Sequence, residues 1–329
     1  MAKITYTDAI RDAIREEMRI DPRVFIMGLD IEFVLWNGEA VREFGAERVR
    51  NTPISEAGFV GAGIGAALTG MRPIVDITCS TFLYSAMDQI VNQAAKIRYM
   101  LGGQASVPLV IRAPVVYSFS LAAHHSDRPW GLFAQAPGLK IIVPATPYDA
   151  KGLLKSAIRD ENPVLCFEDN TLGSLQGEVP EGDYTVPIGL ADVKRSGTDV
   201  TVVAVAGAVS QGLLAAEQLE EEGISVEVVD IRTVVPLDRS TVVKSVRKTG
   251  RLVVLDPAPG SCGVASEIAA SVAESAFEQL RAPIIRITAP DVPVPFSPSL
   301  EGLMYPKVSH IVSTIRRLCA RNRALTSVG

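Results

Sequence analysis

Short apolar segments alternate with longer helix-like segments along almost the whole chain, and this rhythm constrains the fold more than any other feature. In the first half, strands are expected at residues 24–27, 73–77, 108–112, 140–144 and 164–167. A first helix is expected after the possible cap Thr7, with Ile10, Ile14 and Met18 on one face, and further helices are expected at 40–44, 56–70, 84–100 and 148–159. In the second half, strands at 199–206, 225–230, 251–256 and 283–288 alternate with helices at 209–222, 239–248, 264–280 and 307–322.

Strands that alternate with helices form parallel sheets with helices on both faces. We therefore predict an α/β fold made of two doubly wound domains with mainly parallel sheets. A length of 329 residues also favours two domains. The stretch 168–198 is rich in glycine, proline and acids, which is typical of a connection. We place the first domain at 1–180, a linker at 181–198 and the second domain at 199–329.

Composition and charge exclude several classes of protein. The net charge is −5 and no basic stripe is present, so neither a nucleic acid nor an anionic membrane surface is an expected partner. No uncharged apolar run reaches about 20 residues, the length of a membrane span. The N-terminal segment is charged and amphipathic, unlike a signal peptide. The four cysteines are far apart, which favours a cytoplasmic location over a disulfide framework or a zinc site.

The stretch TPISEAGFVGAG, residues 52–63, contains a single carboxylate, Glu56, at the start of an apolar helix. Residues 61–66 satisfy the dinucleotide pattern GxGxxG/A, but Pro53 and Glu56 stand where a buried strand should enter the glycines. An NAD site is therefore not expected. An ionised carboxylate in an apolar site is costly unless it has a partner. Glu56 is either a helix-dipole cap or an acid that shares a proton with a bound heteroaromatic nitrogen, and both interpretations stay open.

Two of the three histidines, His124 and His125, are adjacent on a long segment after a predicted strand. Parallel α/β sheets place their sites on such segments. We expect one histidine to be catalytic, as a general acid or base, and the other to be structural. Neighbours in sequence such as Ser126 and Asp127 cannot complete a hydrolase triad with His125, and no GxSxG elbow occurs. No phosphate-binding Walker A motif and no acidic cluster for magnesium appear either.

Four motifs together resemble one known family over nearly the whole chain. They are TPISEAGFVGAGIGAALTGMRPIVDI (52–77), MDQIVNQAAKIRYMLGGQASVPLVIR (87–112), APGLKIIVPATPYDAKGLLKSAIRDENPV (136–164) and APDVPVPFSPSLE (289–301). The sequence resembles the β subunit of thiamine diphosphate-dependent 2-oxo acid dehydrogenase E1 components. Such a chain consists of a transketolase-like pyrimidine-binding domain and a transketolase-like C-terminal domain.

The resemblance implies roles for particular residues. Glu56 matches the glutamate that hydrogen-bonds to N1′ of the aminopyrimidine, with Ile54 beside it, and Phe82 matches the aromatic residue that packs on this ring. His125 matches the active-site histidine that assists proton and acyl transfer. The matching loop that often holds a monovalent cation, commonly potassium, is formed by Ala157, Ile158, Asp160 and Asn162.

The resemblance also implies partners. The diphosphate and its magnesium ion are held mainly by an E1 α subunit in an α2β2 heterotetramer, and this chain is active only with that subunit. The reaction is decarboxylation of a 2-oxo acid and transfer of the acyl group to a lipoyl carrier, in contact with an E2 acyltransferase. The alternative is the β half of a split transketolase-like or acetoin-type carboligase with a different acceptor.

Three departures from the family pattern cluster around the expected substrate channel. Leu29 replaces an acid after the first strand, residues 113–120 replace a glycine-rich segment, and His124 stands where the family usually has glutamine. Replacing glycines at neighbouring positions changes backbone freedom. We therefore expect a re-lined channel and an unusual substrate or acceptor, although drift in a partner-contacting loop is the alternative. The channel residues are Leu29, Tyr117, Phe119 and His124.

Overall fold

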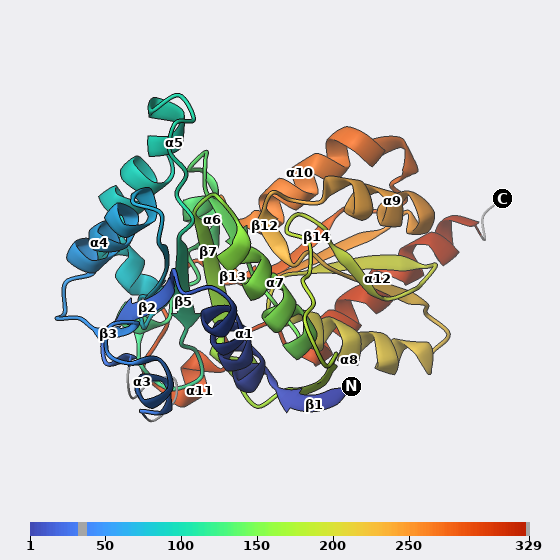
Figure 1. The fold of residues 1–329 in the computed structure, drawn as a ribbon. Coiled ribbons are helices and arrows are strands. Elements are labelled where there is room, and N and C mark those ends of the chain that lie inside the picture. Colours follow the sequence, from blue (N-terminus) through green and yellow to red (C-terminus); the bar gives the residue numbers. More distant parts are fainter. Residues whose placement is uncertain (32–37, 327–329) are drawn as a thin grey trace. The chain divides into compact units, whose positions relative to one another are not determined.

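The chain divides into two compact units in a computed structural model that describes residues 1–31 and 38–326. Unit 1 comprises residues 1–117 and 124–188, and unit 2 comprises residues 118–123 and 189–329. Each unit contains a mainly parallel sheet with helices (Figure 1). The predicted α/β class with two doubly wound parts is confirmed.

Unit 1 is built on parallel strands in the order β6-β7-β5-β4-β2-β3. Their bounds are Val24–Gly28 (β2), Val49–Asn51 (β3), Arg72–Asp76 (β4), Val110–Val115 (β5), Lys140–Ile142 (β6) and Val164–Asp169 (β7). The central strands are apolar and buried along most of their length, as expected for a sheet covered on both faces. Strand β3 was not predicted, because residues 49–51 contain no apolar run.

The helices and turns of unit 1 connect these strands. The helices are Tyr6–Ile20 (α1), Glu39–Phe44 (α3), Glu56–Leu68 (α4), Ile97–Met100 (α5), Trp130–Ala134 (α6) and Pro147–Arg159 (α7). Short 3-10 turns cover Ser80–Ala86 (η1), Ala123–His125 (η3) and Asn170–Leu172 (η4), and a π-helical turn covers Gln89–Ala94 (η2). Helices α1 and α7 lie side by side and enclose much of the core (Figure 1).

Two expectations about these helices are wrong. The cap of α1 is Thr5, whose side chain accepts a hydrogen bond from the Asp8 amide, whereas the Thr7 hydroxyl donates to the carbonyl of Gly173. The predicted continuous helix at 84–100 is broken into η1, η2 and α5. Tyr84, where the predicted helix begins, lies in η1, and its hydroxyl donates to the distant carboxylate of Asp127.

Three more short strands were not predicted. Strand β1 (Ala2–Thr5) pairs antiparallel with β8 (Gln176–Val179) and closes unit 1 near the N-terminus. Strand β9 (Asp192–Arg195) lies inside the predicted linker 181–198 and pairs antiparallel with β11 in unit 2. All three lie in polar segments without a clear alternation of apolar residues.

Unit 2 contains a sheet in the order β14-β13-β10-β11-β9, parallel except for β9. The strands are Val200–Ala204 (β10), Val226–Asp230 (β11), Leu252–Pro259 (β13) and Ile285–Ala289 (β14), with a short strand Thr233–Val235 (β12). The helices are Ala208–Glu220 (α8), Arg239–Thr249 (α9), Val264–Ala276 (α10), Pro298–Glu301 (α11) and Val308–Thr326 (α12), and a 3-10 turn covers Phe277–Gln279 (η5). No helix in the described part of the chain is long and apolar enough to cross a bilayer.

Candidate active site

Glu56 is the first residue of α4 and is half-buried. The preceding Ser55 makes no side-chain capping hydrogen bond, so its hydroxyl does not satisfy the free backbone amides in the first turn of α4. The Glu56 side chain has no hydrogen bond or ion pair with any other residue that the structure describes. A partly buried carboxylate at a helix N-terminus is thus available to an outside partner.

The glycines after Glu56 lie inside helix α4 and not in a strand-to-helix turn. This placement removes the geometry that a dinucleotide fingerprint requires. Gly63 faces the sheet, where a Cβ atom would lie 2.7 Å from Cγ2 of Val75 in β4. Gly58 and Gly65, by contrast, are exposed. The helix therefore packs closely on β4 with one side and presents a face of small residues on the other.

Phe82 and His125 come together from segments that are far apart in the sequence. Phe82 lies in η1 and His125 ends η3, and their ring centroids are 5.4 Å apart with an edge-to-face angle of 70°. Both side chains are half-buried, whereas His124 is exposed. Helix α4 packs against η1, so Glu56 starts a helix that neighbours the Phe82 segment. The structure thus joins two of the predicted site residues directly.

The other predicted channel residues differ in their surroundings. Tyr117 is only 2% exposed, and the guanidinium of the buried Arg128 lies 4.2 Å from its ring centroid. Leu29 is half-buried directly after β2. Phe119 is 57% exposed and belongs to unit 2. The structure therefore places Tyr117 in a packed position and Phe119 on a surface.

The segment 118–123 takes an unusual backbone path within unit 2. Ser118, Ser120 and Ala122 have φ values of 66°, 56° and 60°, in the left-handed region that favours glycine. The carboxylate of Glu301, 3% exposed at the end of α11, accepts the amide of Ser118 at 2.9 Å and that of Ser120 at 3.1 Å. The segment thus keeps a glycine-like path without glycines, and a buried carboxylate stabilises it.

A buried charge network that the sequence analysis missed lies at the carboxyl ends of three strands of unit 1. Arg112 in β5 donates two 2.6 Å hydrogen bonds to Glu168 in β7 and one of 2.5 Å to Asp76 in β4. Burial raises the pKa of Glu168, and Arg112 opposes this effect. Asp76 also accepts the amide of Thr78, whose φ is 65°. The sequence signal that could have revealed this network is a charged residue in each of three otherwise apolar strands.

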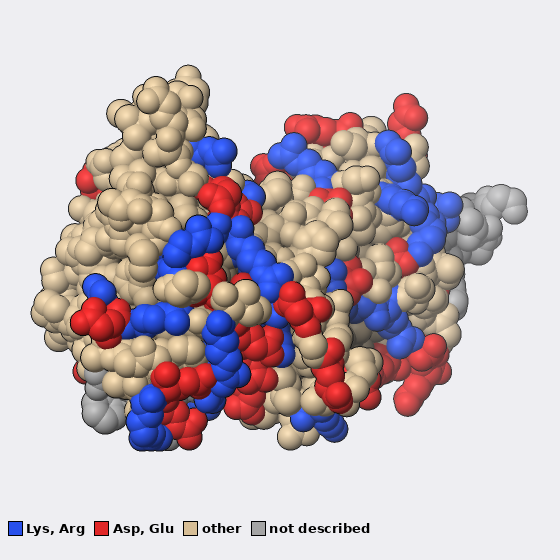
Figure 2. Space-filling model, in the orientation of Figure 1, with Lys and Arg blue, Asp and Glu red and all other residues tan. Residues whose placement is uncertain are grey.

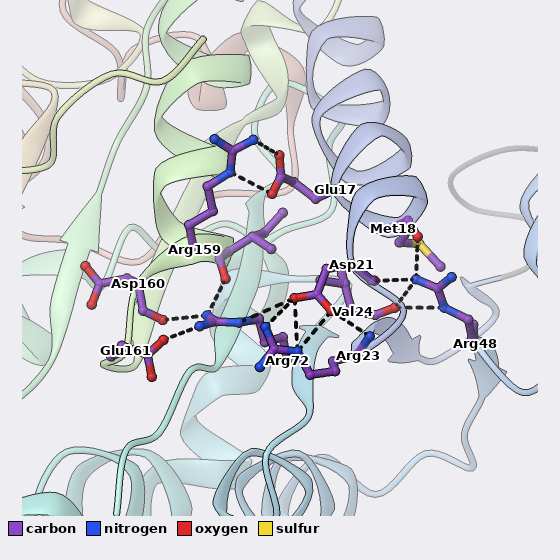
Figure 3. Close-up of polar contacts among 11 residues, drawn as sticks. Glu17, Met18, Asp21, Arg23, Val24, Arg48, Arg72, Arg159, Asp160 and Glu161 are labelled. Carbon is purple, nitrogen blue, oxygen red and sulfur yellow. Dashed lines mark hydrogen bonds and ion pairs between the residues drawn. The ribbon is translucent and has the colours of Figure 1, made fainter. Parts of the chain in front are cut away.

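The predicted cation loop holds a cationic side chain. One nitrogen of Arg72 donates to the carbonyls of Ile158 at 3.0 Å and Asp160 at 3.2 Å, and the guanidinium also pairs with Asp21 and Glu161 (Figure 3). The carboxylate of Asp160 pairs with Lys140 and accepts both the amide and the side chain of Asn162. The carbonyl of Ala157 accepts the Asp160 amide. No cluster of three or more His, Cys, Asp or Glu side chains fit for a metal ion occurs in the described part of the chain.

Comparisons with known proteins define the class. Residues 2–173 match the pyrimidine binding domain of transketolase, and residues 189–311 match the transketolase C-terminal domain. A solved split-gene transketolase, an inactive β4 tetramer, superposes with a TM-score of 0.78 over 96% of this chain and 98% of its own, at 23% identity. The fold is therefore transketolase-like.

Curated relatives define the family more narrowly. The β subunit of acetoin:2,6-dichlorophenolindophenol oxidoreductase from Bacillus subtilis is 46% identical over 96% of this chain and 97% of its own length. The 2-oxoisovalerate dehydrogenase β subunit of the same organism is 43% identical over 97% of this chain and 99% of its own. The pyruvate dehydrogenase E1 β subunit of Rhizobium meliloti is 44% identical over 97% of this chain and 70% of its own.

The chain belongs to the family of β subunits of thiamine diphosphate-dependent 2-oxo acid dehydrogenase E1 components. The family predicted from the four sequence motifs is confirmed, and so is its enzyme class. The comparisons favour the E1 β function over a split transketolase-like carboligase. This membership implies thiamine diphosphate as cofactor and an α subunit as partner.

Proposed function

We propose that this chain is the β half of an E1 enzyme that decarboxylates a 2-oxo acid and passes the acyl group to a lipoyl carrier. The single observation that carries the proposal is Glu56, a half-buried carboxylate with no partner among the described residues. In this interpretation residues 1–180 form the pyrimidine-binding domain, residues 181–198 the linker and residues 199–329 the C-terminal domain.

The residues present fit the aminopyrimidine half of thiamine diphosphate. A ring nitrogen needs a carboxyl partner and the ring needs an apolar or aromatic contact, and Glu56, Phe82 and Ile54 are of these types. Ile54 is 76% exposed in this chain, so a cofactor or a neighbouring subunit would cover it. When bound, the cofactor supplies the carbon nucleophile that adds to the 2-oxo carbonyl. Glu56 would hold a proton at the ring nitrogen, and Phe82 would orient the ring.

His125 is proposed as the second catalytic group. It is half-buried against Phe82, so the imidazole lies beside the residue that would contact the cofactor ring. A histidine in this position can donate or accept a proton at neutral pH. His124 is exposed, so we assign it to the substrate channel together with Leu29, Tyr117 and Phe119.

We propose that an α subunit completes the site in an α2β2 heterotetramer and holds most of the diphosphate and magnesium contacts. The surface of unit 1 over α4 and α5 carries few charged side chains (Figure 2). Tyr99 and Met100 of α5 are 89% and 73% exposed. An apolar surface of this kind is typical of a protein interface. The small residues of α4 would let a partner approach closely.

We also propose that the loop containing Ala157, Ile158, Asp160 and Asn162 binds potassium. Two of its carbonyls already converge on one nitrogen of Arg72, which supports a donor set for a cation. The test measures the thermal unfolding midpoint of the α/β complex in potassium chloride and in tetramethylammonium chloride. Equal midpoints in the two salts would count against potassium binding.

The remaining proposals concern location and the acyl acceptor. Free, separated cysteines support a cytoplasmic enzyme. An E2 acyltransferase with its lipoyl domain is the proposed acceptor, with unit 2 as a docking surface. The co-purified α/β complex should consume a 2-oxo acid only when thiamine diphosphate is present. Assays with pyruvate, branched-chain and larger 2-oxo acids and acetoin, using a lipoyl domain or a dye as acceptor, test this. Failure with every substrate would reject the function.

A further inference from the structure

Three consecutive side chains of unit 1 hold the histidine segment by its backbone. Thr81 donates to the carbonyl of His124 at 2.5 Å, Cys79 to that of His125 at 3.0 Å, and Ser80 to that of Asp127 at 2.6 Å. The two segments are separated by 43 to 47 residues in the sequence. We infer that Cys79, Ser80 and Thr81 are positioning residues for His125, an inference that rests on the proposed catalytic role of this histidine.

The path of the backbone explains how three neighbours can bond to the same segment. Thr78 has a φ of 65°, and the carboxylate of Asp76 accepts its amide at 2.8 Å. Cys79 is extended and Ser80 then begins the 3-10 turn η1. In a regular strand, neighbouring side chains point to opposite faces. The turn removes this alternation, and the triplet can therefore face residues 124–127.

The three donor side chains are buried, which suits a permanent role in positioning the histidine segment. Ser80 is fully buried, and Cys79 and Thr81 are 2% and 6% exposed. Burial raises the pKa of the Cys79 thiol, so the thiol keeps its proton and remains a donor at neutral pH. A buried carbonyl that loses a hydrogen-bond donor is left as an unsatisfied acceptor, which disfavours its present position. The histidine segment is therefore expected to move if one donor is removed.

The triplet also couples the histidine to the proposed cofactor-contacting residue. Phe82 follows Thr81 directly and meets the ring of His125 edge to face. Two residues later, the Tyr84 hydroxyl donates to the carboxylate of Asp127 at 3.1 Å. The segment 79–84 therefore bonds to the backbone on both sides of His125 and contacts its ring. Catalytic groups need placement within about 0.5 Å, which such a two-sided attachment provides.

The test compares Thr81→Val with Thr81→Ser in the co-expressed α/β complex. Valine keeps the shape and removes the hydroxyl, and serine restores the donor. Thr7→Val is the matched control, because Thr7 also donates its hydroxyl to a carbonyl of unit 1, that of Gly173 at 3.1 Å. The readouts are kcat, KM, the pH profile of kcat/KM, and hydrogen exchange of the peptide that contains residues 122–130.

We expect Thr81→Val to lower kcat by roughly 10- to 100-fold with little change in KM, since a displacement of about 1 Å has such an effect. The pH limb that His125→Ala removes should shift, and exchange in 122–130 should rise. Thr81→Ser should restore the wild-type kcat, pH profile and exchange, and Thr7→Val should leave all three unchanged. Ser80→Ala provides a second variant should Thr81→Val fail to assemble, and it should show the same direction of change.

The outcomes separate this inference from the proposed function. If His125→Ala retains full turnover, the catalytic role of His125 is wrong and the triplet has no catalytic group to position. If His125→Ala is inactive while Thr81→Val and Ser80→Ala keep the wild-type kcat, pH profile and exchange, the proposed function stands and the positioning role is overturned.

Discussion

The ring of Phe82 meets the ring of His125 edge to face, with centroids 5.4 Å apart. Such an aromatic pair contributes about 1 kcal/mol beyond the area that it buries. Phe82→Leu should therefore loosen His125 as well as the proposed cofactor contact. We expect the apparent affinity for thiamine diphosphate, measured by recovery of activity in the apo complex, to fall about fivefold. The exposed Phe277→Leu is the control, and equal affinities for the two variants would argue against a cofactor role for Phe82.

Arg112 should be the most sensitive charged residue for the stability of unit 1. Its guanidinium bonds both oxygens of Glu168 and one oxygen of Asp76 in a fully buried position. Arg112→Met would leave two buried carboxylates without their shared cation, a loss of about 3–5 kcal/mol in the free energy of unfolding. Arg15→Met, which breaks the more exposed pair with Glu43, should cost about 1 kcal/mol or less. Urea denaturation measures both, and similar costs would contradict this ranking.

Asp183 should give unit 1 part of its acid sensitivity. Hydrogen bonds from Arg159 and Lys155 lower the pKa of Asp183 to about 2 from its ordinary 3.8. A folded-state pKa below the unfolded one means that the stabilisation is present above pH 3.8 and is lost as pH falls towards 2. Asp183 is 55% exposed, so screening limits this contribution to about 1 kcal/mol or less.

Thermal unfolding of Asp183→Asn and wild type between pH 7 and pH 3 tests this assignment. The wild-type advantage should be constant at neutral pH and should shrink at the acidic end, and 1 M salt should reduce it, since salt weakens ion pairs between exposed side chains. An advantage that grows on acidification would show that the sign is wrong.

Glu301 should control the order of the segment 118–122 in unit 2. Its carboxylate accepts two amides of a backbone with three left-handed, non-glycine residues, each of which costs about 1–2 kcal/mol. Glu301→Gln can offer only one amide oxygen, so hydrogen exchange and proteolysis at 118–122 should rise. Asp199→Asn, which weakens the acceptor of the Ser225 amide, is the matched control in the same unit. Unchanged protection in Glu301→Gln would remove this role.

The regular parts of the fold could be predicted from the sequence because their pattern is local. The apolar runs at 24–27 and 164–167 correspond to β2 and β7, and the amphipathic run at 148–159 corresponds to α7. Strands β1 and β8 could not be predicted, because their stability comes from pairing with each other across more than 170 residues. The predicted helix at 84–100 is broken, and its first residue, Tyr84, belongs to a 3-10 turn and bonds to Asp127, a tertiary contact that no local pattern encodes.

The candidate site was predictable in its residue types but not in its arrangement. Glu56 stood out as the only acid in a long apolar stretch, and the adjacent histidines stood out by their rarity. The contact between Phe82 and His125, however, depends on a tertiary turn that no local periodicity encodes. Likewise, three residues in 118–122 have a left-handed backbone conformation although none of them is glycine. The carboxylate that accepts two amides of this segment belongs to Glu301, which is far away in the sequence.

The central claim is that Glu56 shares a proton with the bound cofactor, and Glu56→Gln in the co-expressed α/β complex tests it most directly. Glutamine keeps the size and removes the titrating group, while the exposed Glu47→Gln is a control for the loss of one negative charge. The measurement is thiamine diphosphate-dependent turnover of the best 2-oxo acid substrate, with assembly verified by size-exclusion chromatography. We expect an intact complex whose kcat falls by about 10²- to 10⁴-fold, the usual contribution of general acid–base catalysis. An intact Glu56→Gln complex with wild-type turnover would contradict it.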